Sequence, residues 1–362
     1  MTAQLRAALA ALPSYVPGRT VAGAIKLASN EIPFPPLDGV LTAIGEAARN
    51  STRYPDLGAV GVTRKLADKL AVDPAQIAVG CGSVALCQQL MEATCESGDE
   101  VLYSWRSFEA YPIAAQIVGA TSVQVPLRDE ALDLEAVADQ INERTRVIFV
   151  CTPNNPTGTT VGQNELEHFF ERVPDDVLVV LDEAYREFAD DPDAVDGVEF
   201  ARSRENVAVL RTLSKAYGLA GLRVGYAVAS SAVAGALRQV GIPFAVNALA
   251  QAAAMAALDS EAEVMDRCRQ VTAERHRVRD ALTSHGYRVP PTQANFVWLP
   301  LRDQATRFAA HCEAGQVIVR PFNHPETGGV RITIGAPAEN DAFLAAATSF
   351  TGPLGATSVS AG

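Results

Sequence analysis

The sequence predicts an α/β fold, in which a large, doubly wound, mostly parallel sheet domain is followed by a smaller α+β domain. With 362 residues, the chain is too long for one small core. Its middle part alternates short β-branched runs with longer helical patterns, which is typical of parallel strands covered by helices on both faces. After residue 245 the pattern changes to long helical segments followed by strand-like pieces.

The strands of the large domain read as almost continuous apolar runs, as expected for a sheet that is buried on both faces. We expect these strands at 101–103, 122–125, 147–151, 177–181, 207–210 and 224–228. The helical patterns between them cover 82–96, 134–141 and 163–172.

In the second domain, helical spacing begins at residue 245 and continues over 261–282, and strands are expected at 295–299, 317–320 and 330–334. We expect the small sheet to be exposed on one face. The predicted division is an N-terminal arm (1–30), a large domain (31–244) and a small C-terminal domain (245–362).

Composition excludes several classes of partner. The net charge of -12 argues against nucleic acid and anionic membranes. The longest apolar segment, 245–258, is too short to span a bilayer, and we find no secretion signal, so we expect a cytoplasmic protein. The six cysteines form no C-x-x-C pair and no metal spacing with the histidines, so no metal is expected.

The most informative segment is 211–223, which places Lys215 after an apolar strand, beside Ser214 and eight residues before Arg223. A lysine amine in a buried turn can bond covalently to an aldehyde cofactor, and a hydroxyl and an arginine can hold a phosphate on that cofactor. These properties suit pyridoxal 5'-phosphate (PLP).

Asp182 follows another apolar strand, and ligands in open α/β sheets collect at the carboxyl ends of strands. A buried carboxylate needs a cationic or donor partner, and the ring nitrogen of PLP would be one. The alternative is that Asp182 only caps the helix that follows it. Tyr185 could donate to the phenolic oxygen of the cofactor, or it could be an ordinary packing residue.

Three further segments are candidates for cofactor contacts. In the turn 151–158, the amide of Asn155 could lie beside the phenolic oxygen, although turns commonly contain these residue types. The glycine turn at 79–83 leads into a helix near Val84, where free amides suit a phosphate, and its alternative is a plain loop with a serine cap. Phe108 could stack on the cofactor ring or belong to the core.

For two residues nearer the chain ends, a functional role competes with a simple structural explanation. Tyr54 lies in an expected loop and could be an exposed turn residue. Arg331 lies within a predicted strand, where it could face solvent or form a bidentate clamp on a substrate carboxylate. The order and spacing of the candidates, rather than any one of them, favour the PLP interpretation.

Through these motifs, nearly the whole chain resembles the fold-type I PLP-dependent aminotransferases. Within that family it resembles the histidinol-phosphate aminotransferase group. The resemblance implies that Lys215 bonds to PLP and shuttles the proton, and that Asp182 pairs with the ring nitrogen. It also implies a homodimer in which Tyr54 reaches the neighbouring site. The resemblance assigns the remaining cofactor contacts to Asn155, Tyr185, Gly82, Ser83, Val84, Phe108, Ser214 and Arg223, and the substrate-facing positions to Tyr15, Asn30, Arg320 and Arg331.

One departure narrows the resemblance. Where the histidinol-phosphate enzymes typically carry an acidic pair after the glycine turn, this chain has Val84 and Ala85, and Phe108 stands where that group often has tyrosine. These features resemble the aromatic amino-acid aminotransferase branch, which implies ping-pong transfer from an aromatic amino acid to 2-oxoglutarate. Histidinol-phosphate transamination is the nearest alternative, and a PLP-dependent decarboxylase and a PLP-fold regulator without turnover are two others.

Overall fold

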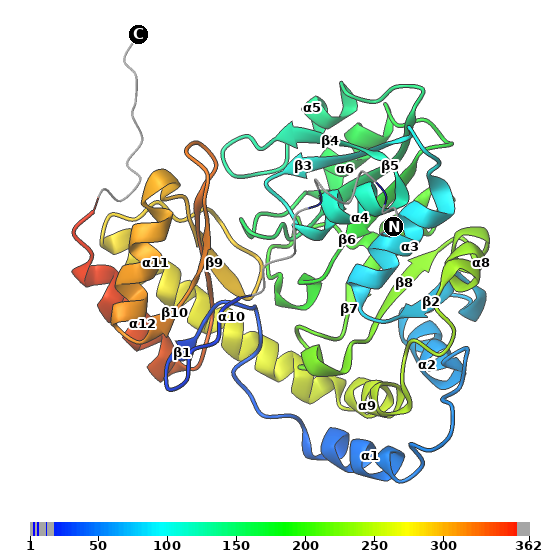
Figure 1. Ribbon diagram of the computed structural model, residues 1–362, viewed down its shortest axis with the longest axis horizontal. Coiled ribbons are helices and arrows are strands. Elements are labelled where there is room, and N and C mark those ends of the chain that lie inside the picture. Colours follow the sequence, from blue (N-terminus) through cyan, green and yellow to red (C-terminus); the bar gives the residue numbers. More distant parts are fainter. Residues whose placement is uncertain (1–2, 4–5, 7–11, 13–17, 353–362) are drawn as a thin grey trace.

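The computed structural model describes residues 18–352 together with Ala3, Arg6 and Leu12, and it is built around a seven-stranded sheet (Figure 1). β8 is antiparallel to both of its neighbours, and the other strands run parallel, so the predicted mostly parallel sheet is confirmed. The strand order is β2 (Ile77–Gly80), β8 (Gly225–Ala229), β7 (Val207–Thr212), β6 (Leu178–Asp182), β5 (Thr145–Cys151), β3 (Glu100–Trp105) and β4 (Thr121–Pro126).

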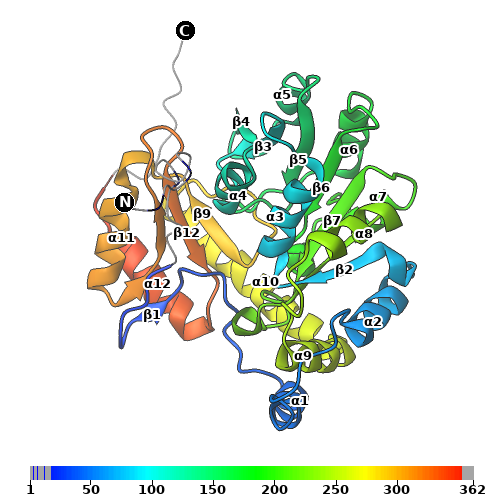
Figure 2. The same cartoon turned by 45° about the vertical axis from the view of Figure 1, so that its right-hand side comes forward.

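Two hydrophobic clusters show that helices cover both faces of this sheet. Along β6, the side chains of Val179 and Leu181 belong to one cluster and that of Val180 to the other, as the two-residue period of a strand requires. One cluster contains α3 (Ser83–Thr94), α4 (Ala110–Val118) and α8 (Ser231–Val240), and the other contains α2 (Val60–Leu70), α5 (Leu134–Ala138), α6 (Gln163–Phe170) and α7 (Gly197–Ala201). The two layers of helices can be followed in Figure 2.

The smaller domain contains an antiparallel sheet in the order β11 (Arg320–Phe322), β12 (Gly329–Thr333) and β9 (Phe296–Leu299). Its helices are α10 (Glu261–Ser284), α11 (Ala305–Ala314) and α12 (Pro337–Ser349), and β1 (Ile25–Lys26) pairs in parallel with β10 (Val317–Ile318). Short 3-10 turns lie at Pro74–Gln76, Arg186–Phe188, Ala220–Leu222 and Arg302–Gln304.

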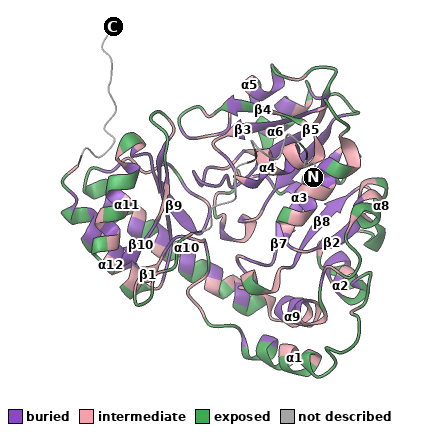
Figure 3. Cartoon of the chain, viewed as in Figure 1, coloured by how far each residue is buried: buried purple, intermediate pink, exposed green. Residues whose placement is uncertain are grey.

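The expectation that this small sheet exposes one face is wrong, because every residue of β9 and β12 is buried (Figure 3). Helices cover one side of the sheet. On the other side, Arg331 donates to the side chain of Asn155, and Trp298 Nε1 donates to Glu130 at 2.9 Å. Both acceptors come from the large domain, which therefore buries the face that was expected to be open.

The domains meet along α10. α9 (Ala248–Asp259) packs against α1 (Asp38–Ala48) and α2, whereas α10 packs against α12 and β9. We propose that the small domain begins with α10 rather than near residue 245, and that it includes β1 from the predicted N-terminal arm.

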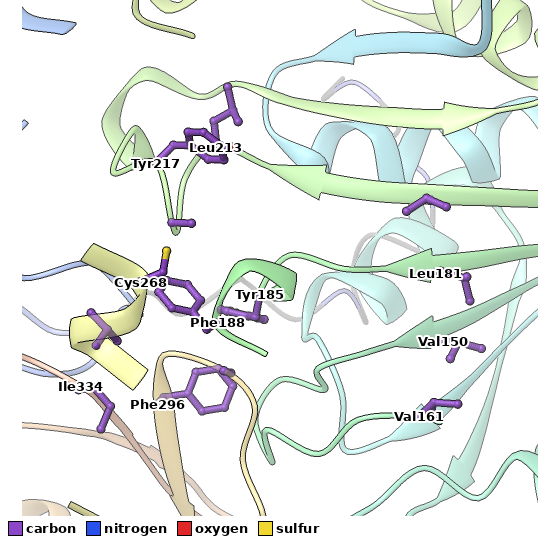
Figure 4. Packing of buried hydrophobic residues seen from close by; sticks show 14 of the residues in the cluster. Val150, Val161, Leu181, Tyr185, Phe188, Leu213, Tyr217, Cys268, Phe296 and Ile334 are labelled. Atoms are coloured by element: carbon purple, nitrogen blue, oxygen red, sulfur yellow. The ribbon is translucent and has the colours of Figure 1, made fainter. Parts of the chain in front are cut away.

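An aromatic contact joins the two domains beside the carboxyl end of β6. The rings of Tyr185 and Phe296 meet edge to face with their centroids 5.1 Å apart. Figure 4 shows these two rings near Phe188 and near Cys268, which belongs to α10. No helix in the described part of the chain is long and apolar enough to cross a membrane.

Candidate active site

A cavity of about 470 Å³ lies at the carboxyl ends of the central strands, where the two domains meet. The fold places candidates from distant parts of the chain around it, because β5, β6 and β7 end at the same edge of the sheet. The predicted residues that line the cavity are Asn30, Ser83, Val84, Phe108, Asn155, Asp182, Tyr185, Ser214, Lys215, Arg223, Arg320 and Arg331.

Lys215 extends from the turn after β7 into this cavity. Its ammonium group donates to the carbonyl oxygen of Ser29 at 3.2 Å and lies 5.9 Å from the centre of the Tyr185 ring. Burial, with the positive charges of Arg331 and Arg223, lowers the pKa of Lys215 to about 7. A large share of the amine is therefore neutral near pH 7, as a nucleophile or proton acceptor must be.

Asp182, the last residue of β6, is only 3% exposed and projects toward the same cavity. Its Oδ2 accepts a hydrogen bond from the hydroxyl of Tyr111 at 2.6 Å, and burial raises the pKa of Asp182 to about 6. Its other oxygen, Oδ1, is buried and has no hydrogen-bond partner among the described residues. A ligand that brings a cationic N–H donor would satisfy this oxygen, and the protonated ring nitrogen of PLP is a donor of this kind.

Two polar pairs, Tyr185 with Asn30 and Arg331 with Asn155, lie in the cavity wall. The Tyr185 hydroxyl accepts from Asn30 Nδ2 at 2.9 Å, and burial raises the pKa of this hydroxyl. Arg331 donates to Asn155 Oδ1 and, at 3.0 Å, to the carbonyl oxygen of Ala28. Arg331 is 8% exposed, so its alternative interpretation as a solvated residue is wrong.

The glycine turn, Ser214 and Arg223 gather at one end of the cavity. Arg223 Nη1 donates to Ser214 Oγ at 3.1 Å. Gly82 has a φ of 76°, and a Cβ added there would lie 2.4 Å from Arg223 Nη2, so glycine allows the close approach of the guanidinium. α3 begins at the next residue, Ser83. The backbone amides of the first turn of a helix have no partner within the helix, so they can bind an anion.

Two residues that the sequence did not single out lie in or behind the cavity wall. Tyr111 supports Asp182, and its own ring stacks against Phe149 and meets Phe108 edge to face at 5.5 Å. Glu109 lines the cavity and accepts from Arg320 Nη2 at 2.9 Å. Glu109 directly follows Phe108 and Tyr111 comes three residues after it, in a segment that was noted only for a stacking ring.

Tyr54 does not line this cavity. Tyr54 is 83% exposed and stacks on Phe244, away from the site of its own chain. Tyr15 lies outside the described residues. Within the described part of the chain, no group of three or more histidine, cysteine or acidic side chains could hold a metal ion.

Comparisons with known proteins agree with this geometry. The family model of class I and II aminotransferases matches residues 22–347. The chain is 57% identical to the aromatic amino acid aminotransferase of Rhodococcus jostii over 350 residues, with 96% of each protein covered. It is 54% identical to the enzyme of the same name from Streptomyces coelicolor, with 96% of this chain and 97% of the relative covered.

Among solved structures, histidinol-phosphate aminotransferase from Sinorhizobium meliloti, in complex with PLP, superposes with a TM-score of 0.88 at 28% identity. The alignment covers 96% of this chain and 97% of that one. The buried oxygen of Asp182, the lowered pKa of the Lys215 amine and the end of the cavity formed by Ser214, Arg223 and the start of α3 all fit PLP. The chain therefore belongs to the class I and II aminotransferase family and has the fold-type I, PLP-dependent architecture.

Proposed function

We propose that this protein is an aromatic amino-acid aminotransferase, which transfers the amino group of phenylalanine, tyrosine or tryptophan to 2-oxoglutarate. The observation that carries this proposal is the near full-length identity of 57% and 54% with relatives that bear that name. Histidinol-phosphate aminotransferase is the second candidate, because a PLP complex of that enzyme has nearly the same fold.

When bound, PLP supplies an electron sink that stabilises negative charge at the substrate α-carbon. We propose that Lys215 holds the cofactor and, once released, takes the proton from the substrate α-carbon and later returns one. The lowered pKa of Lys215, about 7, suits both directions of this transfer near neutral pH. Asp182 would keep the cofactor's ring nitrogen protonated through Oδ1, which has no hydrogen-bond partner in the described part of the chain.

The remaining cofactor contacts follow from the positions of the side chains. Tyr185 and Asn155 would orient the phenolic oxygen, and Phe108 would stack on the ring. Ser214, Arg223 and the first amides of α3 would hold the phosphate, since charge-assisted bonds to Arg and to helix N-termini suit an anion.

Steady-state kinetics test the choice of substrate. Phenylalanine and histidinol phosphate, each paired with 2-oxoglutarate, should give a kcat/KM that favours phenylalanine. A large preference for histidinol phosphate would overturn the proposal and leave the aminotransferase assignment intact.

Arg331 is our candidate for the residue that binds the substrate α-carboxylate. Arg331→Gln should therefore lower kcat/KM about 100-fold for both phenylalanine and 2-oxoglutarate, because truncating one side of a buried charge pair costs roughly 2–5 kcal/mol. Steady-state rates with phenylalanine and with 2-oxoglutarate would measure this loss. Arg277→Gln is the control, because Arg277 pairs with Glu274 and Asp341 near the surface and does not line the cavity. Equal losses in the two variants would contradict the assignment.

Gly82→Ala should weaken PLP binding by roughly tenfold or more, because the new methyl group would push Arg223 away from the phosphate end of the cavity. Absorbance titration of the apoprotein with PLP would measure the affinity. Gly98→Ala is the matched control, since Gly98 also has a positive φ, 98°, but has no atom within 4 Å of the added Cβ. If both variants bind PLP as tightly as the unchanged protein, the cradle is misassigned.

We also propose a homodimer in which Tyr54 reaches the phosphate end of the neighbouring site. Tyr54 is exposed and stacks on Phe244, and two other large apolar side chains, Leu57 and Ile242, are 63% and 75% exposed. Leu57 and Ile242 line a second cavity together with residues of α2 and α8. Such a patch is typical of an interface.

Subunit mixing tests this dimer. Tyr54→Ala and Lys215→Ala proteins should each be impaired, and reassembly from a mixture should restore sites that combine Lys215 of one subunit with Tyr54 of the other. Activity above the sum of the separate variants is the expected result. A monomeric mass in solution, or no gain on mixing, would overturn the proposal.

A further inference from the structure

Asn30 lies in the cavity wall, and the small domain holds its backbone N–H, its carbonyl oxygen and its side-chain oxygen. The N–H donates to Thr333 Oγ1 at 2.9 Å, and the carbonyl oxygen accepts from Asn295 Nδ2 at 3.1 Å. The side-chain oxygen, Oδ1, accepts from the Thr333 hydroxyl at 3.2 Å. The remaining polar group, Nδ2, donates to the Tyr185 hydroxyl at 2.9 Å. All of these residues are buried, so water does not compete for the bonds.

The Thr333 hydroxyl fixes the direction in which the Asn30 amide points. It accepts the Asn30 N–H, so its own hydrogen is available for an acceptor, and Oδ1 is that acceptor. In the reverse orientation the amide would turn Nδ2 toward Thr333, and the threonine hydrogen would lose its acceptor. A buried donor without an acceptor is unfavourable. The threonine therefore holds Nδ2 of Asn30 toward Tyr185.

This orientation determines what the Tyr185 hydroxyl can do. Because Asn30 Nδ2 is only a donor, Tyr185 accepts from it and keeps its own proton for an acceptor in the cavity, which Tyr185 lines. The Tyr185 ring is held from the same side, since Phe296 meets it edge to face (Figure 4). Phe296 is the register partner of Thr333 in the β9–β12 pair. Neighbouring residues of the small sheet thus position both the ring and the hydroxyl.

The backbone of Asn30 suits this position. Its φ is 54°, in the left-handed region that asparagine adopts more readily than most residues with a side chain. The two residues before it are also fixed at the cavity, because the carbonyl oxygen of Ser29 accepts from Lys215 and that of Ala28 accepts from Arg331. Segment 28–30 therefore connects β12 with the residues proposed to bind the cofactor.

We propose that Thr333 and Asn30 are positioning residues that direct the hydroxyl proton of Tyr185 toward the phenolic oxygen of PLP. This inference rests on the proposed contact between Tyr185 and that oxygen, and it does not depend on which amino acid is the substrate. A bond donated by Tyr185 stabilises negative charge on the phenolic oxygen. When PLP is bound to a lysine, the phenolic oxygen and the lysine nitrogen share one proton. A weaker bond from Tyr185 therefore lets that proton remain up to a higher pH.

A pH titration of the PLP-loaded protein, followed by the absorbance of the bound cofactor, measures where this proton leaves. In Thr333→Val the Asn30 amide is free to turn, and Tyr185 can donate to Oδ1 in place of the cofactor. The midpoint should rise by about one pH unit, the size of one hydrogen bond to a charged oxygen. The substitution changes none of the charged or titratable groups that face Tyr185 or Lys215, which are Arg331, Asp182, Cys151, Arg223, Glu31 and Lys26.

Matched variants separate the hydroxyl of Thr333 from the shape of its side chain. Thr333→Ser keeps the hydroxyl and should leave the midpoint unchanged. Thr145→Val removes another buried hydroxyl, which accepts the Asn142 N–H at 3.0 Å and does not line the cavity, and it should also have no effect. A shift in either variant as large as in Thr333→Val would overturn the inference. If Thr333→Val does not fold, Thr333→Ala removes the same hydroxyl and carries the same expectation.

Tyr185→Phe decides whether Thr333 acts through Tyr185. This variant should raise the midpoint by itself, and Thr333→Val should add no further shift in that background. An equal shift in both backgrounds would show that Thr333 acts by another route and would overturn the inference. An unmoved midpoint in Thr333→Val, while Tyr185→Phe raises it, overturns this inference alone. An unmoved midpoint in Tyr185→Phe overturns the proposed cofactor contact and this inference with it.

Discussion

Lys215→Ala is expected to slow transamination by about 10⁴-fold, the upper end of what a positioned acid–base group contributes. The variant loses both the amine that holds PLP and the group that moves the α-proton. Single-turnover rates with phenylalanine, and the absorbance of bound PLP, would measure the two losses separately. Lys65→Ala is the control, because Lys65 only pairs with Asp259 near the surface.

A Lys215→Ala protein that transaminates within tenfold of the unchanged enzyme would rule out this mechanism. Correct folding of the variant can be checked by its circular dichroism and its subunit mass. A correctly folded, inactive variant that still takes up PLP without a covalent bond is the specific result expected for the loss of the amine.

The pKa of Lys215 also predicts a pH dependence for uptake of PLP by the apoprotein. Only the neutral amine attacks an aldehyde, and this amine has a pKa lowered from 10.5 to about 7. The uptake rate should therefore rise about tenfold per pH unit below pH 7 and level off above it. Stopped-flow absorbance from pH 5 to pH 9 would measure the profile. A rate that still rises steeply at pH 9 would contradict a lowered pKa.

The structure places most of the predicted cofactor candidates around one cavity, because several of them lie at or shortly after the end of a strand. Asp182 is the last residue of β6 and Lys215 lies in the turn after β7, and a parallel sheet brings such strand ends to one edge. Spacing along the chain was therefore sufficient to gather them. β2 was not predicted, since it is only Ile77–Gly80 and ends in the glycine turn that drew attention instead.

Contacts between distant segments could not be read from local patterns. Arg331 meets Asn155 across 176 positions, and Arg320 meets Glu109 across 211. Neither partner carries a sequence signal for the other. The small sheet was misjudged for the same reason, since β12 presents Arg331 to the large domain, and that contact is what buries the face.

Asp182→Asn is expected to lower the transamination rate by about 10³-fold, since breaking a buried charged pair costs roughly 3–5 kcal/mol. The neutral amide cannot keep the ring nitrogen of PLP protonated, so the cofactor loses its capacity to accept charge. Single-turnover kinetics would measure the loss. Asp259→Asn, at an exposed ion pair, is the control.

The same substitution should stabilise the protein without its cofactor. Burial raises the pKa of Asp182 from 3.8 to about 6, so the folded state binds this proton more tightly than the unfolded state. The contribution of the protonated Asp182 carboxyl to the free energy of unfolding is fully present below pH 3.8 and is lost as the pH rises through about 6. At pH 8 the ionised carboxylate costs the apoprotein up to about 3 kcal/mol, at 1.36 kcal/mol per pKa unit.

Asparagine carries no charge to desolvate, so the apoprotein of Asp182→Asn should melt at a higher temperature than unchanged apoprotein at pH 8, and the gap should narrow at pH 5. With PLP bound the order should reverse, because only the carboxylate pairs with the charged ring nitrogen. Thermal denaturation of both proteins with and without PLP, at the two pH values, would measure these differences. If Asp182→Asn instead lowers the stability of the apoprotein at pH 8, the ionised Asp182 carboxylate stabilises the fold itself. The idea that its burial is an unfavourable state kept for cofactor binding would then be wrong.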